Sequence, residues 1–255
     1  MQPLAGALCA VCGERIHGFA GSFAKESAAP ASADGGDFDA QLCGLCRRAQ
    51  PPFQRAVAFG AYEGVLRELL HLFKFEGVRS AEHILGQYAA QAASALPIAD
   101  TLVVPVPLHV RRRRERGFNQ AERIARAAAR ELRLPLVTGC LERTRWTESQ
   151  IGLTRHQRRA NLRGAFRVNK RNRGRIAGRD VLLMDDILTT GSTAAECARV
   201  LMRAGARQVF VATVARALKG ETGKAGSGVI AEERFVSKSE IGSPASEIAI
   251  APPAP

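Results

Sequence analysis

Residues 181–193, with the sequence VLLMDDILTTGST, constrain the fold of this chain more than any other segment. The apolar run at 181–184 indicates a buried strand, and two adjacent carboxylates, Asp185 and Asp186, follow it. A loop of small, mostly hydroxylated residues comes next, and an apolar helical pattern begins at Ala194. Ligands of open α/β sheets bind beyond the carboxyl ends of the strands, and the N–H groups at a helix N-terminus favour anions. The segment therefore predicts an α/β fold that holds a phosphate in the loop and uses the two acids as acceptors for sugar hydroxyls.

A plainer interpretation is an ordinary strand–turn–helix connection in which Thr193 caps the helix. That interpretation accounts for the threonine, but it gives no reason for two consecutive acids at the end of a buried strand. We therefore favour the phosphate site.

Length and charge limit the size of the fold and the kind of partner that the chain can bind. The 255 residues suffice for one α/β domain with a small appendage. A net charge of +13 favours anionic partners such as polyphosphates, nucleic acid or an acidic protein surface, although a solvated basic surface explains it equally well. No apolar run is as long as a membrane span, which needs about 18 residues. No secretory signal is recognised near the N-terminus, so we expect a cytoplasmic protein without a membrane span.

Two C-x2-C pairs lie near the N-terminus, and they predict a structural zinc site. Cys9 and Cys12 form the first pair, and Cys43 and Cys46 form the second. Two such pairs can complete a tetrahedral site of four thiolates for Zn²⁺. A low-complexity stretch at about 20–40 lengthens the spacing and is interpreted as a flexible insertion. The alternative is four thiols that hold no metal.

The apolar patterns divide the rest of the chain into a zinc-ribbon-like module at 1–52, a central domain at 53–217 and a disordered tail at 218–255. Within the central domain Lys74 falls near the end of a predicted helix, and we favour a role in complementing the helix dipole over contact with a phosphate. Cys140 and Cys197 are interpreted as buried structural thiols. Strands are predicted at 55–62, 101–106 and 208–214, and helices at 65–75, 82–96, 117–132 and 193–204.

Two basic stretches flank the predicted sheet edge. The strand at 101–106 runs into the rigid loop of Pro105, Val106 and Pro107, and five arginines follow within residues 111–116. Arginines at such a place, among them Arg112 and Arg114, form a good polyphosphate clamp. Between Glu148 and Asp180 there are ten Arg or Lys residues and no acid, which suits a lid over a pyrophosphate or a nucleic-acid contact.

The order of residues at 181–193 resembles the phosphoribosyl-pyrophosphate (PRPP) signature of the type I phosphoribosyltransferases. Together with the paired cysteines, the segment PVPL…RERGFNQAE at 105–122 and the spacing from Gln150 to Phe166, it makes residues 7–216 resemble the ComF family. The insertion at 20–40 and the tail depart from that pattern.

The resemblance implies a type I phosphoribosyltransferase-like parallel sheet flanked by helices, PRPP bound with Mg²⁺, and a cytoplasmic role in DNA uptake and natural competence beside a helicase-like partner. It implies that Asp185 and Asp186 are the catalytic acids. The implied PRPP-binding residues are Ile187, Leu188, Thr189, Thr190, Gly191, Ser192, Thr193, Pro105, Val106, Pro107, Arg112 and Arg114.

Three functions stay open from the sequence. The protein is either a glycosyltransferase that passes the phosphoribosyl group to an acceptor that no motif marks, or a catalytically silent accessory that binds a nucleotide or single-stranded DNA through its basic stretches. The third alternative is a zinc-ribbon scaffold that recruits partners.

Overall fold

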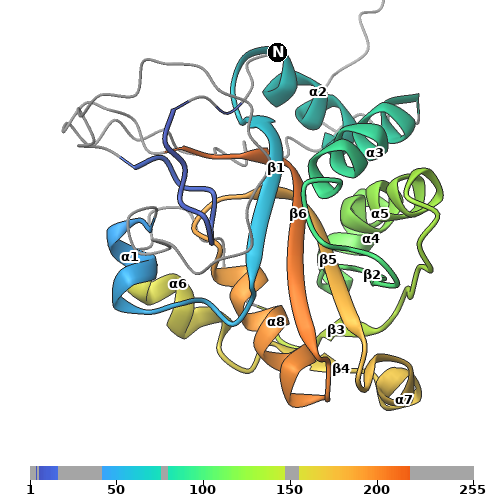
Figure 1. Cartoon of the computed structure of the whole chain (residues 1–255). Helices are drawn as coiled ribbons and strands as arrows, with labels where there is room; N and C mark the ends of the chain where they lie inside the picture. The colour runs from blue at the N-terminus through green and yellow to red at the C-terminus, as the bar shows by residue number, and fades with distance from the viewer. Residues whose placement is uncertain (1–3, 5, 17–41, 76–79, 147–154, 219–255) are drawn as a thin grey trace, which may run out of the picture.

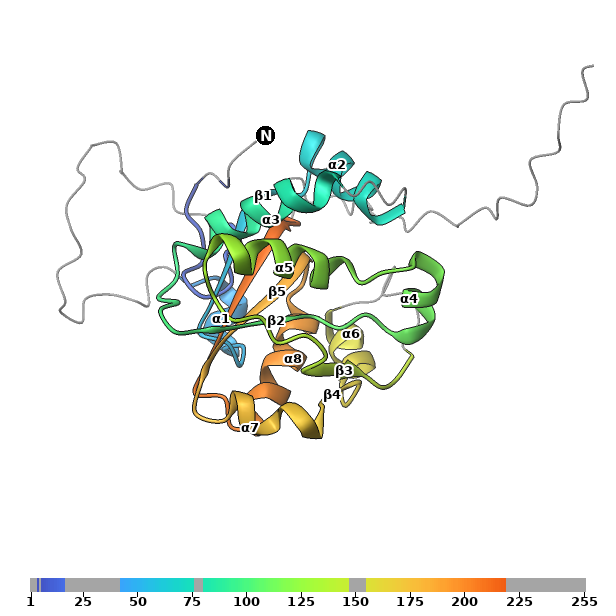
Figure 2. The same cartoon turned by 90° about the vertical axis from the view of Figure 1, so that its right-hand side faces the viewer.

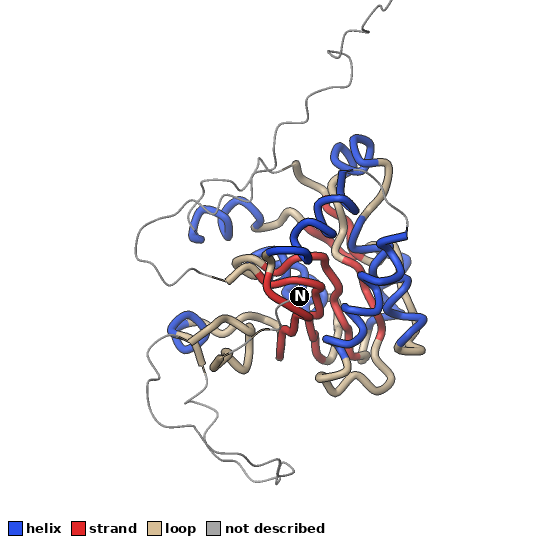
Figure 3. The backbone as a smooth tube through the Cα atoms, turned by 90° about the horizontal axis from the view of Figure 1, so that it is seen from above, coloured by secondary structure: helices blue, strands red, loops and turns tan. Residues whose placement is uncertain are grey.

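The computed structural model describes residues 4, 6–16, 42–75, 80–146 and 155–218. Its centre is a four-stranded parallel sheet of order β1-β6-β5-β2. Seen from above, the strands lie side by side with helices on both flanks (Figure 3). The strands are β1 (Arg55–Ala61), β6 (Gln208–Arg216), β5 (Asp180–Leu188) and β2 (Leu102–Pro105).

Helices cover both faces of this sheet. On one face α3 (Ser80–Ala93) and α5 (Gln120–Glu131) pack against the strands, and α8 (Ser192–Arg203) packs on the other (Figure 2). Along β5 the side chains of Leu182 and Met184 join the first of these apolar layers, whereas Val181 and Leu183 join the second. A strand buried on both faces carries a continuous apolar run, which is why 181–184 has no polar alternation. The predicted α/β fold is confirmed.

The remaining elements are short or peripheral. They are α1 (Gly44–Arg48), α2 (Gly64–Phe75), α4 (Val110–Arg116), α6 (Arg155–Leu162), α7 (Arg173–Ile176), the 3-10 turn η2 (Lys170–Asn172), and the antiparallel pair β3 (Leu141–Arg143) and β4 (Phe166–Val168). No helix of the described residues has the length and apolar character needed to span a membrane.

The described strands and helices match the expected ones to within a few residues, with two differences near the site. Strand β5 continues through Asp185 and Asp186, which therefore lie within the strand and not after it, because β6 runs alongside as far as the pair Leu188–Arg216. The arginine run at 111–116 forms helix α4, whose first turn is capped by His109 Nδ1, the acceptor of the Arg111 N–H at 3.2 Å.

The two predicted low-complexity regions lie almost wholly outside the described residues, which leave out 17–41 and 219–255. Of the basic segment before β5, residues 147–154 are likewise outside the described part of the chain. Its described portion packs on the domain, because Leu162, Ala165 and Phe166 belong to the same apolar layer as α8.

Candidate functional site

The acid pair lies near the carboxyl end of β5, where Lys74 of α2 contacts it. Each carboxylate turns back onto the backbone: Asp185 Oδ1 accepts the N–H of Asp186 at 2.9 Å, and Asp186 Oδ1 accepts the N–H of Ile187 at 2.7 Å. These bonds fix one oxygen of each carboxylate and thereby orient both side chains.

Lys74 supplies the charge that faces this pair. It lies in the last turn of α2, and its Nζ is 2.7 Å from Asp186 Oδ2, with each side chain 15% exposed. The sequence interpretation weighed a phosphate contact against a helix-dipole role for Lys74 and favoured the second, so the partnership with Asp186 was missed. It joins residues far apart in the chain, and the only local signal is a lysine between two aromatic residues, Phe73 and Phe75.

The two acids have opposite electrostatic surroundings. Burial acts to raise the pKa of Asp186, but the ammonium group of Lys74 and then the guanidinium of Arg116 bring that pKa below its usual value. Burial and the charge of Asp186 hold the pKa of Asp185 well above its usual value. One acid is therefore kept as a paired carboxylate, whereas its neighbour resists ionisation.

The loop after β5 presents the N-terminus of α8. Gly191 is the N-cap residue with φ = 72° and ψ = 6°, a left-handed conformation that glycine adopts readily, and Ser192 is the first helical residue. Thr193 is therefore not the cap, contrary to the plainer interpretation of the sequence. Gly191 has no side chain to cap the helix, and the N–H of Ser192 donates to Thr190 Oγ1 at 3.4 Å. The N–H groups of this first turn face the end of the helix, where an anion is favoured. Thr190 Oγ1 lies 3.0 Å from Ser192 Oγ, which brings two hydroxyl groups to the same turn.

The loop after β2 lies beside the same edge. The N–H of Val106 donates to the carbonyl of Met184 at 2.9 Å, and Asn119 Nδ2 donates to the carbonyl of Val106 at 3.0 Å. These bonds fix residues 105–107 between β5 and the start of α5. The structure thus brings Pro105, Val106 and Pro107 to the edge that carries the acids, as the sequence predicted for this strand end.

The arginines of the predicted clamp lie on helix α4 and take different positions. Arg112 lies over the ring of Trp146, with 5.8 Å between its guanidinium carbon and the ring centroid, and Arg114 is exposed. Of the arginines in α4, Arg116 is the one whose charge acts on Asp186. The sequence interpretation included Arg116 in the arginine run but named only Arg112 and Arg114 as binding residues.

Trp146 is the centre of a second cluster that the sequence interpretation also missed. The His109 ring packs against it in an edge-on arrangement with 5.0 Å between centroids, and the Arg111 guanidinium lies 4.9 Å from its ring centre. Burial and then the charges of Arg143, Arg111 and Arg112 lower the pKa of His109. Trp146 stays 37% exposed, so an aromatic surface lies among basic groups. The available signal was the sequence RTRW at 143–146.

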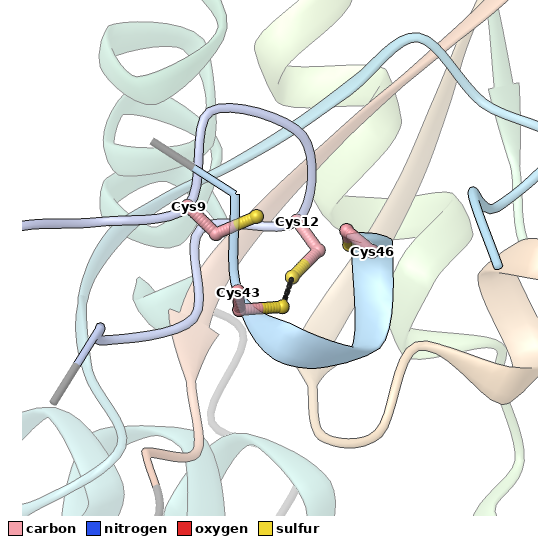
Figure 4. A group of neighbouring side chains, drawn as sticks. All are labelled: Cys9, Cys12, Cys43 and Cys46. Atoms are coloured by element: carbon pink, nitrogen blue, oxygen red, sulfur yellow. Dashed lines mark hydrogen bonds between the residues drawn. The ribbon is translucent and has the colours of Figure 1, made fainter. Parts of the chain in front are cut away.

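The four N-terminal cysteines meet in one place, as predicted. The Sγ atoms of Cys9, Cys12, Cys43 and Cys46 all lie within 4.8 Å of one another, and all four side chains are buried (Figure 4). Cys12 and Cys43 are 3.7 Å apart at sulfur. Four converging thiols are the donor set of a closed, structural zinc site, so the residues fit Zn²⁺.

The cysteine site is packed on the central domain. The N–H of Ala56 in β1 donates to the carbonyl of Val11 at 2.7 Å, and the four cysteines belong to the same apolar layer as α8. Figure 1 shows α1 and the N-terminal segment beside β1. The knuckles are thus joined to the sheet by both hydrogen bonding and apolar contact.

Comparison with known proteins agrees with this architecture. The phosphoribosyl transferase domain family matches residues 114–230. The DNA utilization protein YhgH of Escherichia coli K12 is 35% identical over 182 residues, which cover 69% of this chain and 78% of that protein. The chain belongs to the ComF family.

Other members of the ComF family and one solved structure extend the comparison. Competence protein F of Haemophilus influenzae is 32% identical over 184 residues, covering 70% of this chain and 80% of that protein. The structure titled as the allosteric regulatory enzyme of purine biosynthesis is 20% identical over 52% of this chain, with a TM-score of 0.36. This ComF chain spans about a quarter of that enzyme's length, since the match covers 26% of it.

Proposed function

We propose that this protein binds PRPP with Mg²⁺ at the carboxyl edge of the sheet and acts in the handling of DNA taken up by the cell. The observation that carries the proposal is the continuous run from the acid pair at the end of β5 into the N-terminus of α8, with Gly191 at the turn. The names of its relatives, DNA utilization protein and competence protein F, support the cellular role. A cytoplasmic location agrees with six cysteines that form no disulfide.

Each part of the ligand then has a counterpart in the chain. The N–H groups and hydroxyls of residues 189–193 hold the 5-phosphate, because they offer donors at the positive end of the helix dipole. Asp185 and Asp186 accept hydrogen bonds from the two ribose hydroxyls. The loop at 105–107 and the basic side chains of α4 lie on the side of the pyrophosphate. Mg²⁺, when bound, offsets the charge that develops on the leaving pyrophosphate.

Transfer of the phosphoribosyl group is the second step of the proposal. A nucleophile displaces pyrophosphate at C1 of the ribose, and the sugar gains positive charge as the bond to pyrophosphate breaks. The carboxylate of Asp186 stabilises that charge, and Lys74 keeps the same carboxylate ionised when no ligand is present. The acids therefore serve both binding and the reaction.

Titration calorimetry of the full chain with PRPP and Mg²⁺ tests the binding step. We expect Mg²⁺-dependent binding that weakens when Asp185→Asn and Asp186→Asn are combined, because each lost charge-assisted hydrogen bond costs about 1.5–3 kcal/mol. Asp100→Asn is the matched control, because Asp100 is exposed and lies before the amino end of β2, at the end of the sheet opposite the acid pair. Equal affinity in the wild type and the double variant would contradict the proposal.

A second candidate function, binding of single-stranded DNA without turnover, is favoured by the exposed ring of Trp146 among His109, Arg111 and Arg112. Aromatic rings stack on bases and guanidinium groups contact phosphates, so this cluster carries both elements of such a site. A pyrophosphate-release assay with a panel of bases, run beside a DNA-binding assay, separates the two functions. Release of pyrophosphate supports the enzyme, whereas DNA binding without release supports the accessory.

A further inference from the structure

Arg216 is the last residue of β6 and one of the few charged side chains that the fold buries, with 3% of its surface exposed. Its Nη2 donates to Glu14 Oε2 at 2.9 Å and lies 4.0 Å from the sulfur of Cys12. Its Nε and Nη1 are buried and have no hydrogen-bond partner among the described residues. Buried guanidinium groups are rare unless they are paired, so two unused donors beside a cluster of thiols require an explanation.

The guanidinium stands between the cysteine site and the phosphate loop. A small cavity of ≈ 20 Å³, room for about one water molecule, separates the two. Cys12 and Cys46 line it from the metal side, and Gly191 and Ser192 line it from the loop, with Arg216 itself in the wall. The backbone makes the same connection, because Arg216 pairs with Leu188, the residue that precedes the loop.

We propose that Arg216 is the counter-ion of a tetrathiolate metal site and that it couples this site to the phosphate loop. Four thiolates around Zn²⁺ leave two net negative charges in a buried place, and the sulfurs remain hydrogen-bond acceptors. The Arg216 donors offset that charge, as groups around metal ligands commonly do. The metal thereby holds the end of β6, and with it the start of the loop, in one arrangement.

The cavity and the pairing of Arg216 with Leu188 indicate how loss of the metal would reach the phosphate loop. Without metal the four sulfurs are no longer held together, and the guanidinium keeps only Glu14 as a fixed partner. Arg216 is then free to shift, and Leu188 and the Gly191 turn lose a fixed neighbour. The consequence for phosphate binding rests on the proposed function, whereas the consequence for metal retention and for motion of the loop does not.

Zinc release from the purified full chain tests the counter-ion. Release to a chelator is followed for the wild type, Arg216→Met, Arg216→Lys and the control Arg207→Met, which removes an arginine paired with Asp180 at the other end of the same strands. We expect release about 10–100-fold faster from Arg216→Met than from the wild type, with Arg216→Lys between them. Equal release from Arg216→Met and Arg207→Met overturns the assignment.

Hydrogen exchange tests the coupling between the metal site and the loop in the absence of PRPP. Removal of zinc from the wild type is expected to speed exchange of peptides that cover residues 188–193, while peptides from β2 keep their rate. This comparison uses only the wild type, so it decides the matter even where Arg216→Met does not fold. Unchanged exchange of the loop overturns the coupling.

Calorimetry with PRPP then separates this inference from the proposed function. Weaker PRPP binding by the zinc-free protein supports both. Loop exchange that responds to zinc in a protein that binds no PRPP supports the coupling and refutes the ligand. PRPP binding that is unaffected by zinc removal, with an unchanged loop, overturns the coupling and leaves the proposed ligand standing.

Discussion

Lys74 and Asp186 form an ion pair across the open edge of the sheet, with Nζ 2.7 Å from Oδ2. The pair connects α2 to the strand that carries the candidate site, and it uses the carboxylate to which the proposed ribose would bind. Both side chains are partly buried, so water screens the pair less than it would screen one at the surface. Lys74 is therefore the described residue that most directly sets the charge of Asp186 before a ligand arrives.

Replacing Lys74 by methionine is expected to make ligand binding more sensitive to acid. Burial alone raises the pKa of Asp186, and Lys74 is the main group that opposes this effect. In the variant the carboxyl group takes up a proton at a higher pH than in the wild type. Affinity for Mg²⁺ and PRPP, measured by calorimetry, should therefore fall about 10-fold further between pH 8 and pH 5.5 in the variant, a change of about 1.4 kcal/mol.

Lys74→Arg is the control for this experiment, because it keeps the positive charge and should retain the wild-type pH response. An identical pH response in Lys74→Met and the wild type would show that Lys74 does not control Asp186.

Asp185→Asn is expected to stabilise the protein, with a gain that grows as the pH rises. The folded chain holds the pKa of Asp185 well above its usual value, so it binds a proton there more tightly than the unfolded chain does. The wild type therefore loses stability as the pH rises from about 4 through the raised folded-state pKa. Asparagine does not titrate, so the difference in the free energy of unfolding should reach the order of 1 kcal/mol at pH 7. Urea unfolding at pH 4, 5.5 and 7 measures it.

Asp180→Asn is expected to change the free energy of unfolding with the opposite dependence on pH. Hydrogen bonds from Arg207 lower the pKa of Asp180, so its contribution is present above about pH 4 and is lost as the pH falls through the lowered folded-state pKa. This variant should be destabilised at pH 7 and approach the wild type in acid. If both variants show the same pH trend, the assignment of Asp185 is wrong.

Combining Cys43→Ser with Cys46→Ser is expected to abolish zinc binding and to lower the melting temperature. Native mass spectrometry should find one Zn²⁺ in the wild type and none in the variant. The sheet should stay folded, because β5, β6 and α8 keep their packing, but the hydroxyls enter the apolar layer that all four cysteines share with α8. Cys140→Ser is the control, because this thiol is buried away from the cluster and its loss should leave the metal in place. Full zinc occupancy in the double variant would refute the ligand assignment.

Single-stranded DNA, where it binds, should contact the Trp146 cluster. The logarithm of affinity falls with the logarithm of salt concentration at a slope of about −0.7 per phosphate contact. Replacing Arg111 and Arg112 by alanine should reduce that slope, whereas Trp146→Ala should keep the slope and cost about 1–3 kcal/mol of stacking.

The same assay applied to variants of Arg155, Arg158 and Arg159 tests the second basic stretch, for which the sequence analysis left a lid over a pyrophosphate and a nucleic-acid contact open. Fluorescence anisotropy at several salt concentrations gives the salt dependence of DNA affinity for both sets of arginine variants. Absence of binding at about 50 mM salt in the wild type would exclude this function and leave the arginines to the phosphate ligand.

The fold and the place of the site follow from local sequence, whereas the partners of the site do not. Parallel strands buried on both faces leave apolar runs such as 181–184, and the turn before α8 needs Gly191, so both were visible. The contact of Lys74 with Asp186 and that of Arg216 with Glu14 join distant segments, and no periodicity encodes them. Strands β3 and β4 have three residues each, too few to display an alternation.

Helix α4 is a different case, because its signals were present. His109 caps its first turn, and Gly117 ends it with φ = 77°. The sequence analysis interpreted the arginine run by its charge, as a ligand clamp, and did not use His109 and Gly117 as helix boundaries. The position of Arg116, whose charge acts on Asp186, depends on this helix, which the sequence analysis did not predict.

The short distance between Cys12 and Cys43 also determines what the chain tolerates between them. Their sulfurs are 3.7 Å apart, although 30 residues separate the two cysteines in the sequence. The entropy lost on closing such a loop grows only with the logarithm of its length, so each doubling costs about 0.6 kcal/mol. Lengthening the connection between the two cysteines is therefore expected to cost little free energy, and a fluorescent or affinity label inserted within residues 20–40 should leave the four thiols together.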